Sequence, residues 1–147
     1  NLNLIGGYEY NDEERAFAEK LQETLIAPSN LANTNAVMPY RVEEDGIGGS
    51  TDVGDVSWVV PTAGMRAATW VPGTSGHSWQ AVAAGGTSIG TKGMIVAAKT
   101  MALTAIDLYK DPSIIKAAKE ELLRRRGPDF IYTPLTGDRE PPLDYRN

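Results

Sequence analysis

Residues 87–109 have the sequence TSIGTKGMIVAAKTMALTAIDLY, and this stretch decides the fold class because it predicts one long helix. Thr87 or Ser88 can cap its N-terminus with a side-chain oxygen. Apolar residues recur at helical spacing and predict a broad stripe that is largely buried. The positions of the stripe are Ile89, Met94, Ile95, Ala98, Met101, Ala102, Ala105 and Ile106. A helix of this kind needs other elements to cover it.

Three further segments have helical patterns. Residues 11–26 start with a capping Asn and acidic side chains, continue with apolar residues at helical spacing, and stop at Pro28. Residues 112–126 follow Asp111 as a cap, start with a proline, and end in three arginines at the negative end of the helix dipole. A short helix is expected over residues 53–60, before Pro61.

The segments between these helices predict little regular structure. Residues 65–71 have the composition of a strand, and residues 73–86 are rich in glycine and serine, which predicts an irregular loop. Residues 27–40 are a polar connecting loop, and residues 128–147, with four prolines, are an extended tail. Helices dominate and strands are few, so the sequence predicts part of an α/β domain.

Composition excludes several classes of protein. The chain has 147 residues, 41% of them hydrophobic, which suits one domain with one core. Its net charge of −5 argues against a nucleic-acid or anionic-membrane partner. The longest apolar run, residues 94–108, is interrupted by Lys99 and Asp107, so no membrane span is expected. The first residue is Asn1 rather than Met, and we expect a longer polypeptide without a signal peptide.

Cysteine and histidine content limits the metal chemistry. The chain has no cysteine and a single histidine, His77. This excludes thiolate zinc sites, disulfides and a cysteine nucleophile, and it fits a reducing compartment. One histidine cannot build a multi-histidine metal site, so any such site must take ligands from elsewhere.

His77 is the first candidate functional residue. It lies in PGTSGHSW, residues 72–79, after the expected strand, and loops in this position hold the ligands of open α/β sheets. Glycines beside it, including Gly76, allow a metal or substrate to approach closely. The alternative is a surface or hydrogen-bonded loop histidine, because a single histidine in a glycine loop is a weak signal.

The remaining candidates each have an ordinary structural interpretation. Residues 48–52, GGSTD, could bind an anion at a helix N-terminus, but helix capping needs the same residue types. Residues 43–45, EED, are expected to be solvated carboxylates rather than an acid–base pair. Residues 46–50 lack the lysine of a phosphate loop. The tryptophans Trp58, Trp70 and Trp79 are expected in the core or in a pocket wall.

An ordered series of motifs resembles a known family over about residues 10–125. The motifs are GSTDVGDVSW at 49–58, PT at 61–62, GT at 73–74, HSWQ at 77–80, TSIG at 87–90, KGM at 92–94 and AAKTMA at 97–102. Together they resemble the C-terminal part of metal-dependent amidohydrolases, the aminoacylase and hippurate-hydrolase group of dinuclear metallopeptidases. Their order makes the resemblance far more specific than any single motif.

The resemblance implies roles for a few residues. His77 takes the place of the family's last metal-binding histidine, and Ser50, Thr51, Asp52 and Gly76 take places beside the substrate cleft. The family's other ligands, its general base and a lid histidine have no counterpart here, and Glu43-Glu44 does not match its glutamate pair. We therefore expect no catalytic residue in this chain, no turnover by the chain alone, and no metal bound by it alone.

The resemblance also implies a whole protein. The chain would be the C-terminal part of a three-layer α/β/α catalytic domain, with residues 1–127 following an inserted lid domain and 128–147 forming the tail. The enzyme would be cytoplasmic, carry two zinc or manganese ions, and hydrolyse the amide of an N-acyl or aminobenzoyl amino acid. Its partners would be the missing N-terminal half, the lid, and another subunit in a homo- or hetero-oligomer. A half-domain of this kind should leave an apolar face exposed. The alternative is a non-catalytic α/β binding or interaction fragment.

Overall fold

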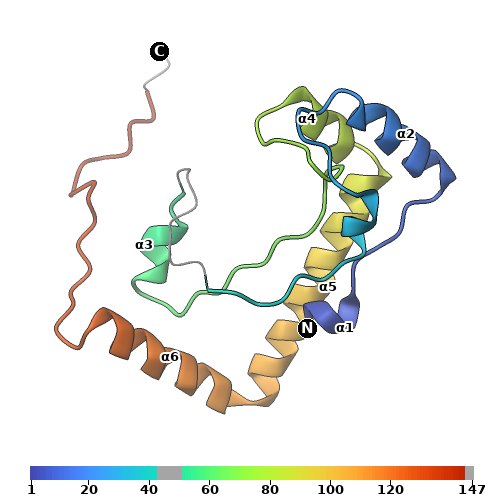
Figure 1. Ribbon diagram of the computed structural model, residues 1–147. Coiled ribbons are helices and arrows are strands. Elements are labelled where there is room, and N and C mark those ends of the chain that lie inside the picture. Colours follow the sequence, from blue (N-terminus) through green and yellow to red (C-terminus); the bar gives the residue numbers. More distant parts are fainter. Residues whose placement is uncertain (43–50, 145–147) are drawn as a thin grey trace. The chain divides into compact units, whose positions relative to one another are not determined.

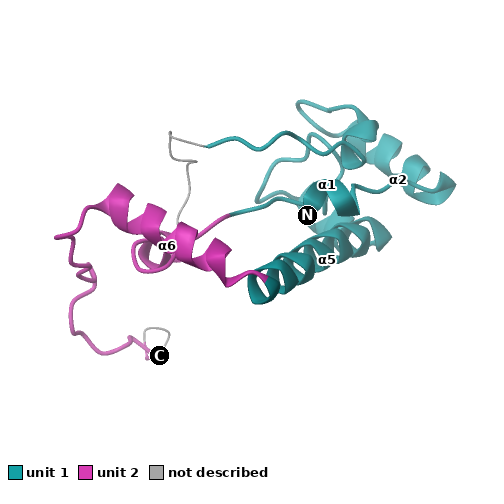
Figure 2. Ribbon diagram, turned by 90° about the horizontal axis from the view of Figure 1, so that it is seen from below, with its two compact units in different colours: residues 1–44, 64–110 teal, residues 45–63, 111–147 magenta. Residues whose placement is uncertain are grey.

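The computed structural model describes residues 1–42 and 51–144, and within these ranges it contains helices and no strand (Figure 1). The helices are α1 (Leu2–Ile5), α2 (Asp12–Gln22), the 3-10 helix η1 (Leu31–Thr34), α3 (Val53–Ser57), α4 (Trp79–Gly85), α5 (Ser88–Lys110) and α6 (Pro112–Arg126). The chain divides into two compact units, shown in different colours in Figure 2. Unit 1 comprises residues 1–44 and 64–110, and unit 2 comprises residues 45–63 and 111–147.

Unit 1 has a small apolar core where three helices and a loop meet. Its buried members are Ala18 and Leu21 of α2, Val71, Ala84 of α4 and Ile89 of α5. Partly buried side chains surround them: Tyr8, Tyr10, Phe17, Leu31 and Ala83. This core fixes α2 and α4 against the first turns of α5.

Helix α2 begins as the sequence predicts. Asn11 accepts a hydrogen bond from the Glu14 amide, and the Glu14 carboxylate accepts one from the Asn11 amide, both at 2.8 Å. This reciprocal capping box satisfies two amides that a helix N-terminus leaves free. The helix ends at Gln22 rather than at residue 26, because Thr24 turns back and donates its hydroxyl to the Leu21 carbonyl.

Helix α5 has nearly the predicted bounds, but the prediction that it is largely buried is wrong. Within the described chain only Ile89, Gly90, Gly93 and Thr100 of this helix are buried. Apolar residues in the rest of the helix are exposed, with Met94 at 56% and Met101 at 59%. Helix α4 contacts the first turns of α5, and α1 contacts it further along, where the Asn1 side chain donates to Thr104 and Asp107. Among the described residues these short elements leave most of the apolar stripe exposed.

Among the described residues, α5 is long and apolar enough to cross a membrane, with a mean hydropathy of 1.2. Core helices of soluble proteins can have the same length and composition.

Residues 65–71 do not form the predicted strand. A strand needs a neighbouring strand to complete its backbone hydrogen bonds, and none of the described segments supplies one. The segment instead runs beside α5, where a Cβ on Gly93 would lie 2.0 Å from the Ala68 carbonyl oxygen. The Tyr8 hydroxyl donates to the same carbonyl at 2.7 Å. The absence of a side chain at Gly93 is what allows this approach.

Unit 2 is built on α3 and α6. Helix α3 ends at Ser57, three residues before its predicted end, whereas α6 has the predicted bounds, with Asp111 accepting from the Ser113 amide as its cap. The rings of Trp58 and Phe130 stack with centroids 4.7 Å apart. Arg126 donates to the Trp58 carbonyl at 2.6 Å, which ties the end of α6 to the end of α3.

Candidate functional site

The loop before His77 is anchored by its backbone. Val71 is buried in the core of unit 1, and the following carbonyl, of Pro72, accepts from the Ser29 amide at 3.3 Å. Gly73 has a φ of +95°, and a Cβ there would lie 2.5 Å from the Ala27 carbonyl oxygen. Glycine is therefore required at position 73 for both conformation and space. The loop is fixed against the segment that follows α2.

His77 lies in a turn directly before α4. Its φ of 56° places it in the left-handed region, which non-glycine residues adopt uncommonly and in which histidine is enriched. Such conformations gather at functional sites when the surroundings hold them. The next residue, Ser78, donates its hydroxyl to the Ser75 carbonyl at 2.7 Å and accepts from the Ala81 amide at 3.2 Å. The turn is thus held on both sides of the histidine.

The prediction of an irregular loop over residues 73–86 is wrong for its second half, which forms α4. The signal was present in the sequence: a serine cap followed by WQAVAAG and a further glycine. Similarly, η1 interrupts the predicted connecting loop at residues 27–40, with the Asn30 side chain accepting from the Ala32 amide. His77 therefore lies directly before a helix, α4, which the sequence analysis did not predict.

A shallow open pocket of about 500 Å³ borders His77. Its lining residues are Trp70, His77, Ser78, Trp79, Ala81 and Val82. The tryptophans are only partly covered, at 40% exposed for Trp70 and 61% for Trp79. The prediction that tryptophans stand in the core or a pocket wall is confirmed for these two.

The predicted cleft residues are distributed over both units. Gly76 lies beside His77 in unit 1, is exposed, and has open space where a side chain would stand. Thr51 and Asp52 lie in unit 2, where the Thr51 hydroxyl accepts from the Val53 amide at 3.3 Å. Asp52 precedes α3 without a side-chain cap bond. Ser50 and residues 43–49 lie outside the described residues.

His77 can provide one ligand of a metal site. Within the described residues the imidazole of His77 has no hydrogen-bond or ion-pair partner, so its nitrogens are free to bind. No group of three or more metal-binding side chains occurs in the part of the chain that the structure describes. A neutral imidazole suits zinc and related ions, but a single one binds them weakly. This chain can therefore supply one ligand and would need the others from elsewhere.

A polar cluster around the buried Glu14, which the sequence analysis did not predict, joins α2 to α5. Glu14 is 5% exposed and accepts hydrogen bonds from Lys92 at 2.5 Å and from the Ser88 hydroxyl at 2.6 Å. Burial opposes ionisation of Glu14, but the hydrogen bonds from Lys92, Ser88 and the Asn11 amide outweigh it and lower the pKa of Glu14. Burial also raises the pKa of the nearby Tyr10 hydroxyl to about 12. The cluster holds the scaffold of the His77 loop and does not border the pocket.

Comparison with known proteins gives a strong similarity to a hydrolase. The chain is 37% identical to a subunit of the p-aminobenzoyl-glutamate hydrolase of Escherichia coli (strain K12) over 144 aligned positions, covering 82% of this chain. It spans 30% of the length of that relative. No family model and no solved structure matches the chain. The similarity agrees with the family resemblance drawn from the sequence motifs.

Proposed function

We propose that this chain is a segment of a metal-dependent amidohydrolase that cleaves the amide bond of an N-acyl or aminobenzoyl amino acid. The similarity to one polypeptide of a hydrolase supports an amidohydrolase. The observation that carries the assignment to a site is His77, which is exposed, unpartnered within the described residues and held in a left-handed turn at the edge of a pocket.

In this proposal His77 supplies one neutral imidazole to a pair of divalent ions, zinc or manganese. Such a pair contributes Lewis acidity, which activates water and polarises the amide carbonyl. The anchored loop at Gly73 and the cap at Ser78 orient the imidazole, so little conformational freedom is lost when it binds. The general base and the remaining ligands would come from other parts of the polypeptide, together with an inserted lid.

The same proposal assigns the fold. The described helices would form the C-terminal part of a three-layer α/β/α domain, and residues 65–71 would become a strand once a neighbouring strand is present. Residues 1–127 would belong to that domain and residues 128–147 to its tail. Thr51 and Asp52, with Ser50, would border the cleft together with Gly76. We further propose a cytoplasmic enzyme that assembles with another subunit, since the relative is itself named as a subunit.

The test uses the full-length polypeptide that contains this chain. Purified protein loaded with zinc or manganese should hydrolyse p-aminobenzoyl-glutamate, and metal analysis should give two ions per chain. His77→Ala should lower the metal content and reduce turnover by orders of magnitude, because the Lewis acid depends on both ions. Circular dichroism should show an unchanged fold, since an exposed imidazole contributes little packing.

Two controls separate this proposal from a non-catalytic interaction fragment. Tyr40→Ala removes a ring that is 91% exposed in the connecting loop of unit 1 and should leave activity and metal content unchanged. The 147-residue chain alone should show no turnover. Full activity and two metal ions in the His77→Ala protein would refute the role of His77, and the absence of metal-dependent amide hydrolysis in the full-length protein would favour the interaction fragment.

A further inference from the structure

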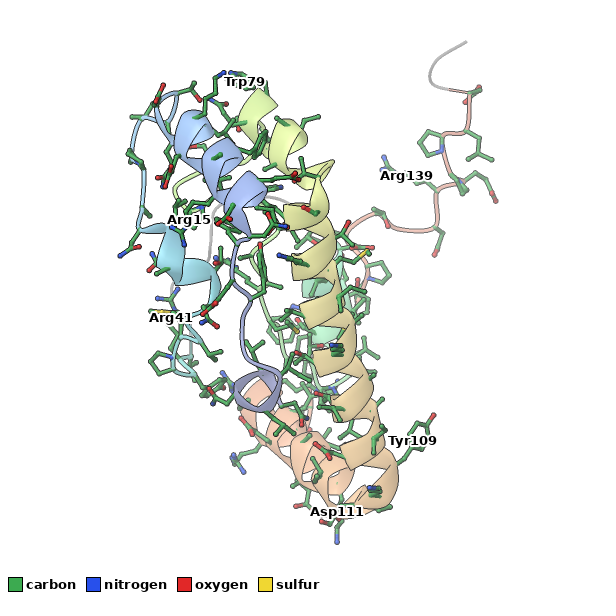
Figure 3. The ribbon with its side chains drawn as sticks, turned by 90° about the vertical axis from the view of Figure 1, so that its right-hand side faces the viewer. Arg15, Arg41, Trp79, Tyr109, Asp111 and Arg139 are labelled. Atoms are coloured by element: carbon green, nitrogen blue, oxygen red, sulfur yellow. The ribbon has the colours of Figure 1, made fainter. Side chains whose placement is uncertain are left out.

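The pocket beside His77 has an aromatic wall made by Trp70 and Trp79. Trp79 is the first residue of α4, and Trp70 directly precedes the buried Val71. The Trp70 ring also lies against the end of α4, because a Cβ on Gly85 would be 3.7 Å from the Trp70 Nε1. Both indoles therefore stand on fixed backbone although much of their surface is open to a ligand. Figure 3 shows Trp79 at the α4 end of unit 1, with Tyr109 at the other end of α5.

The charge of the lining indicates which part of a substrate it can hold. Among the described residues, no Lys, Arg, Asp or Glu side chain lines this pocket, and the polar side chains in its wall, apart from the indoles, are His77 and Ser78. The Ser78 hydroxyl is already engaged in capping α4. The amino-acid half of an N-acyl amino acid carries a carboxylate, which needs a cation or several donors when it leaves water. The acyl half carries no charge and fits this wall.

We infer that Trp70 and Trp79 hold the acyl half of the substrate and select a planar aromatic acyl group over an aliphatic one. This inference rests on the proposed function. Aromatic rings favour offset-stacked or edge-to-face contacts with one another. Each such pair contributes binding free energy beyond that of the apolar area it buries. A short aliphatic acyl group gains little from the same wall. In this inference the tryptophans are specificity-determining residues, and they line the same pocket as the imidazole that the proposed function assigns to the metal site.

The experiment compares two substrates that differ only in the acyl group, N-benzoylglutamate and N-acetylglutamate, with the full-length, metal-loaded polypeptide. The unaltered protein should favour the benzoyl compound in kcat/KM by at least about tenfold. Trp79→Leu keeps an apolar side chain but removes the ring, and it should raise KM for the benzoyl compound about tenfold. Its kcat, and both constants for the acetyl compound, should stay within about twofold. Trp79→Phe should recover most of the affinity.

Tyr40→Ala is the matched control, because it removes an exposed ring from the same unit outside the pocket, and it should leave the kinetic constants for both substrates unchanged. Trp70→Leu should act in the same direction as Trp79→Leu. An equal loss for both substrates, or no preference for the benzoyl compound, would overturn the inference while leaving the proposed function intact. Hydrolysis of neither amide by the unaltered protein would overturn the proposed function, and the inference would fall with it.

Discussion

At the scale of single residues, Gly73 decides whether the loop before His77 can reach its position. Its φ of +95° is unfavourable for any residue with a Cβ, and the space where a Cβ would stand is occupied by the backbone at Ala27 and Pro28. Backbone atoms cannot move aside as the end of a flexible side chain can. The geometry of the His77 turn therefore depends on a glycine four residues upstream.

Gly73→Ala is expected to destabilise the protein by about 2 kcal/mol or more, the sum of backbone strain and the contact with Ala27. Urea unfolding of the two proteins measures the difference. Gly76→Ala is the control from the same loop, because Gly76 has no positive φ and open space around its Cβ position. It should change stability by less than about 0.5 kcal/mol. Equal effects at the two positions would contradict the close approach at Gly73.

The buried carboxylate of Glu14 stabilises unit 1 through its ion pair with Lys92. Glu14→Gln preserves the capping box, since glutamine can take the same part in it, but removes the ion pair with Lys92. We expect a loss of about 2 kcal/mol at pH 7, because Lys92 keeps partial contact with water. Glu13→Gln, an exposed neighbour, should lose less than about 0.5 kcal/mol.

The stability difference between the unaltered protein and Glu14→Gln should depend on pH. The folded pKa of Glu14 lies below its ordinary value of 4.5, so its stabilisation is complete above pH 4.5 and disappears as the pH falls through the lower, folded pKa. The urea midpoint of the unaltered protein should therefore approach that of Glu14→Gln in acid. A difference between the two that stays constant from pH 7 to pH 3 would show that Glu14 is not ionised in the folded state.

At the scale of elements, the sequence predicts what local chemistry determines. The capping box at Asn11 and the Asp111-Pro112 start of α6 are complete within a few residues, and both helices begin where predicted. The strand at residues 65–71 fails because a strand depends on a partner that no local pattern supplies. The prediction that α5 is buried fails for the same reason, since a helical stripe shows which face is apolar and not what covers it.

At the site, the left-handed turn at His77 and the indole wall depend on contacts between α4, α5 and the loop at residues 71–78.

Contact between α5 and residues 67–69 gives a test at this scale. Gly93→Ala would favour the helix in isolation, but its Cβ would meet the Ala68 carbonyl at 2.0 Å and Thr69 at 2.9 Å. We expect destabilisation of about 2 kcal/mol or more in urea unfolding. Gly54→Ala in α3 has open space and should be neutral or stabilising by up to about 1 kcal/mol. A stabilising Gly93→Ala would show that the segment does not pack on α5.

At the scale of the whole molecule, the apolar surface exceeds what the core accounts for. The buried apolar residues in the described ranges are Ala18, Leu21, Val71, Ala81, Ala84 and Ile89. Along α5, by contrast, Met94, Ala98, Met101 and Ala105 follow one another at helical spacing and are all exposed. Such a surface requires cover in water, and the similarity to a relative more than three times as long supports cover by other parts of a polypeptide.

The 147-residue chain by itself is therefore expected to self-associate at micromolar concentration through this face of α5. Sedimentation velocity should show species larger than a monomer, and the double variant Met94→Lys/Met101→Lys should shift the chain toward monomer, since two charges on one face oppose its burial. In the full-length polypeptide the same variant should instead lower stability by several kcal/mol, because there the charges would enter an interior. Ile131→Lys, at a residue that is 84% exposed in unit 2, controls for the effect of added charge. A monomeric parent chain, combined with a full-length variant of unchanged stability, would mean that the stripe faces solvent in both proteins and that α5 is not an interior helix of the longer enzyme.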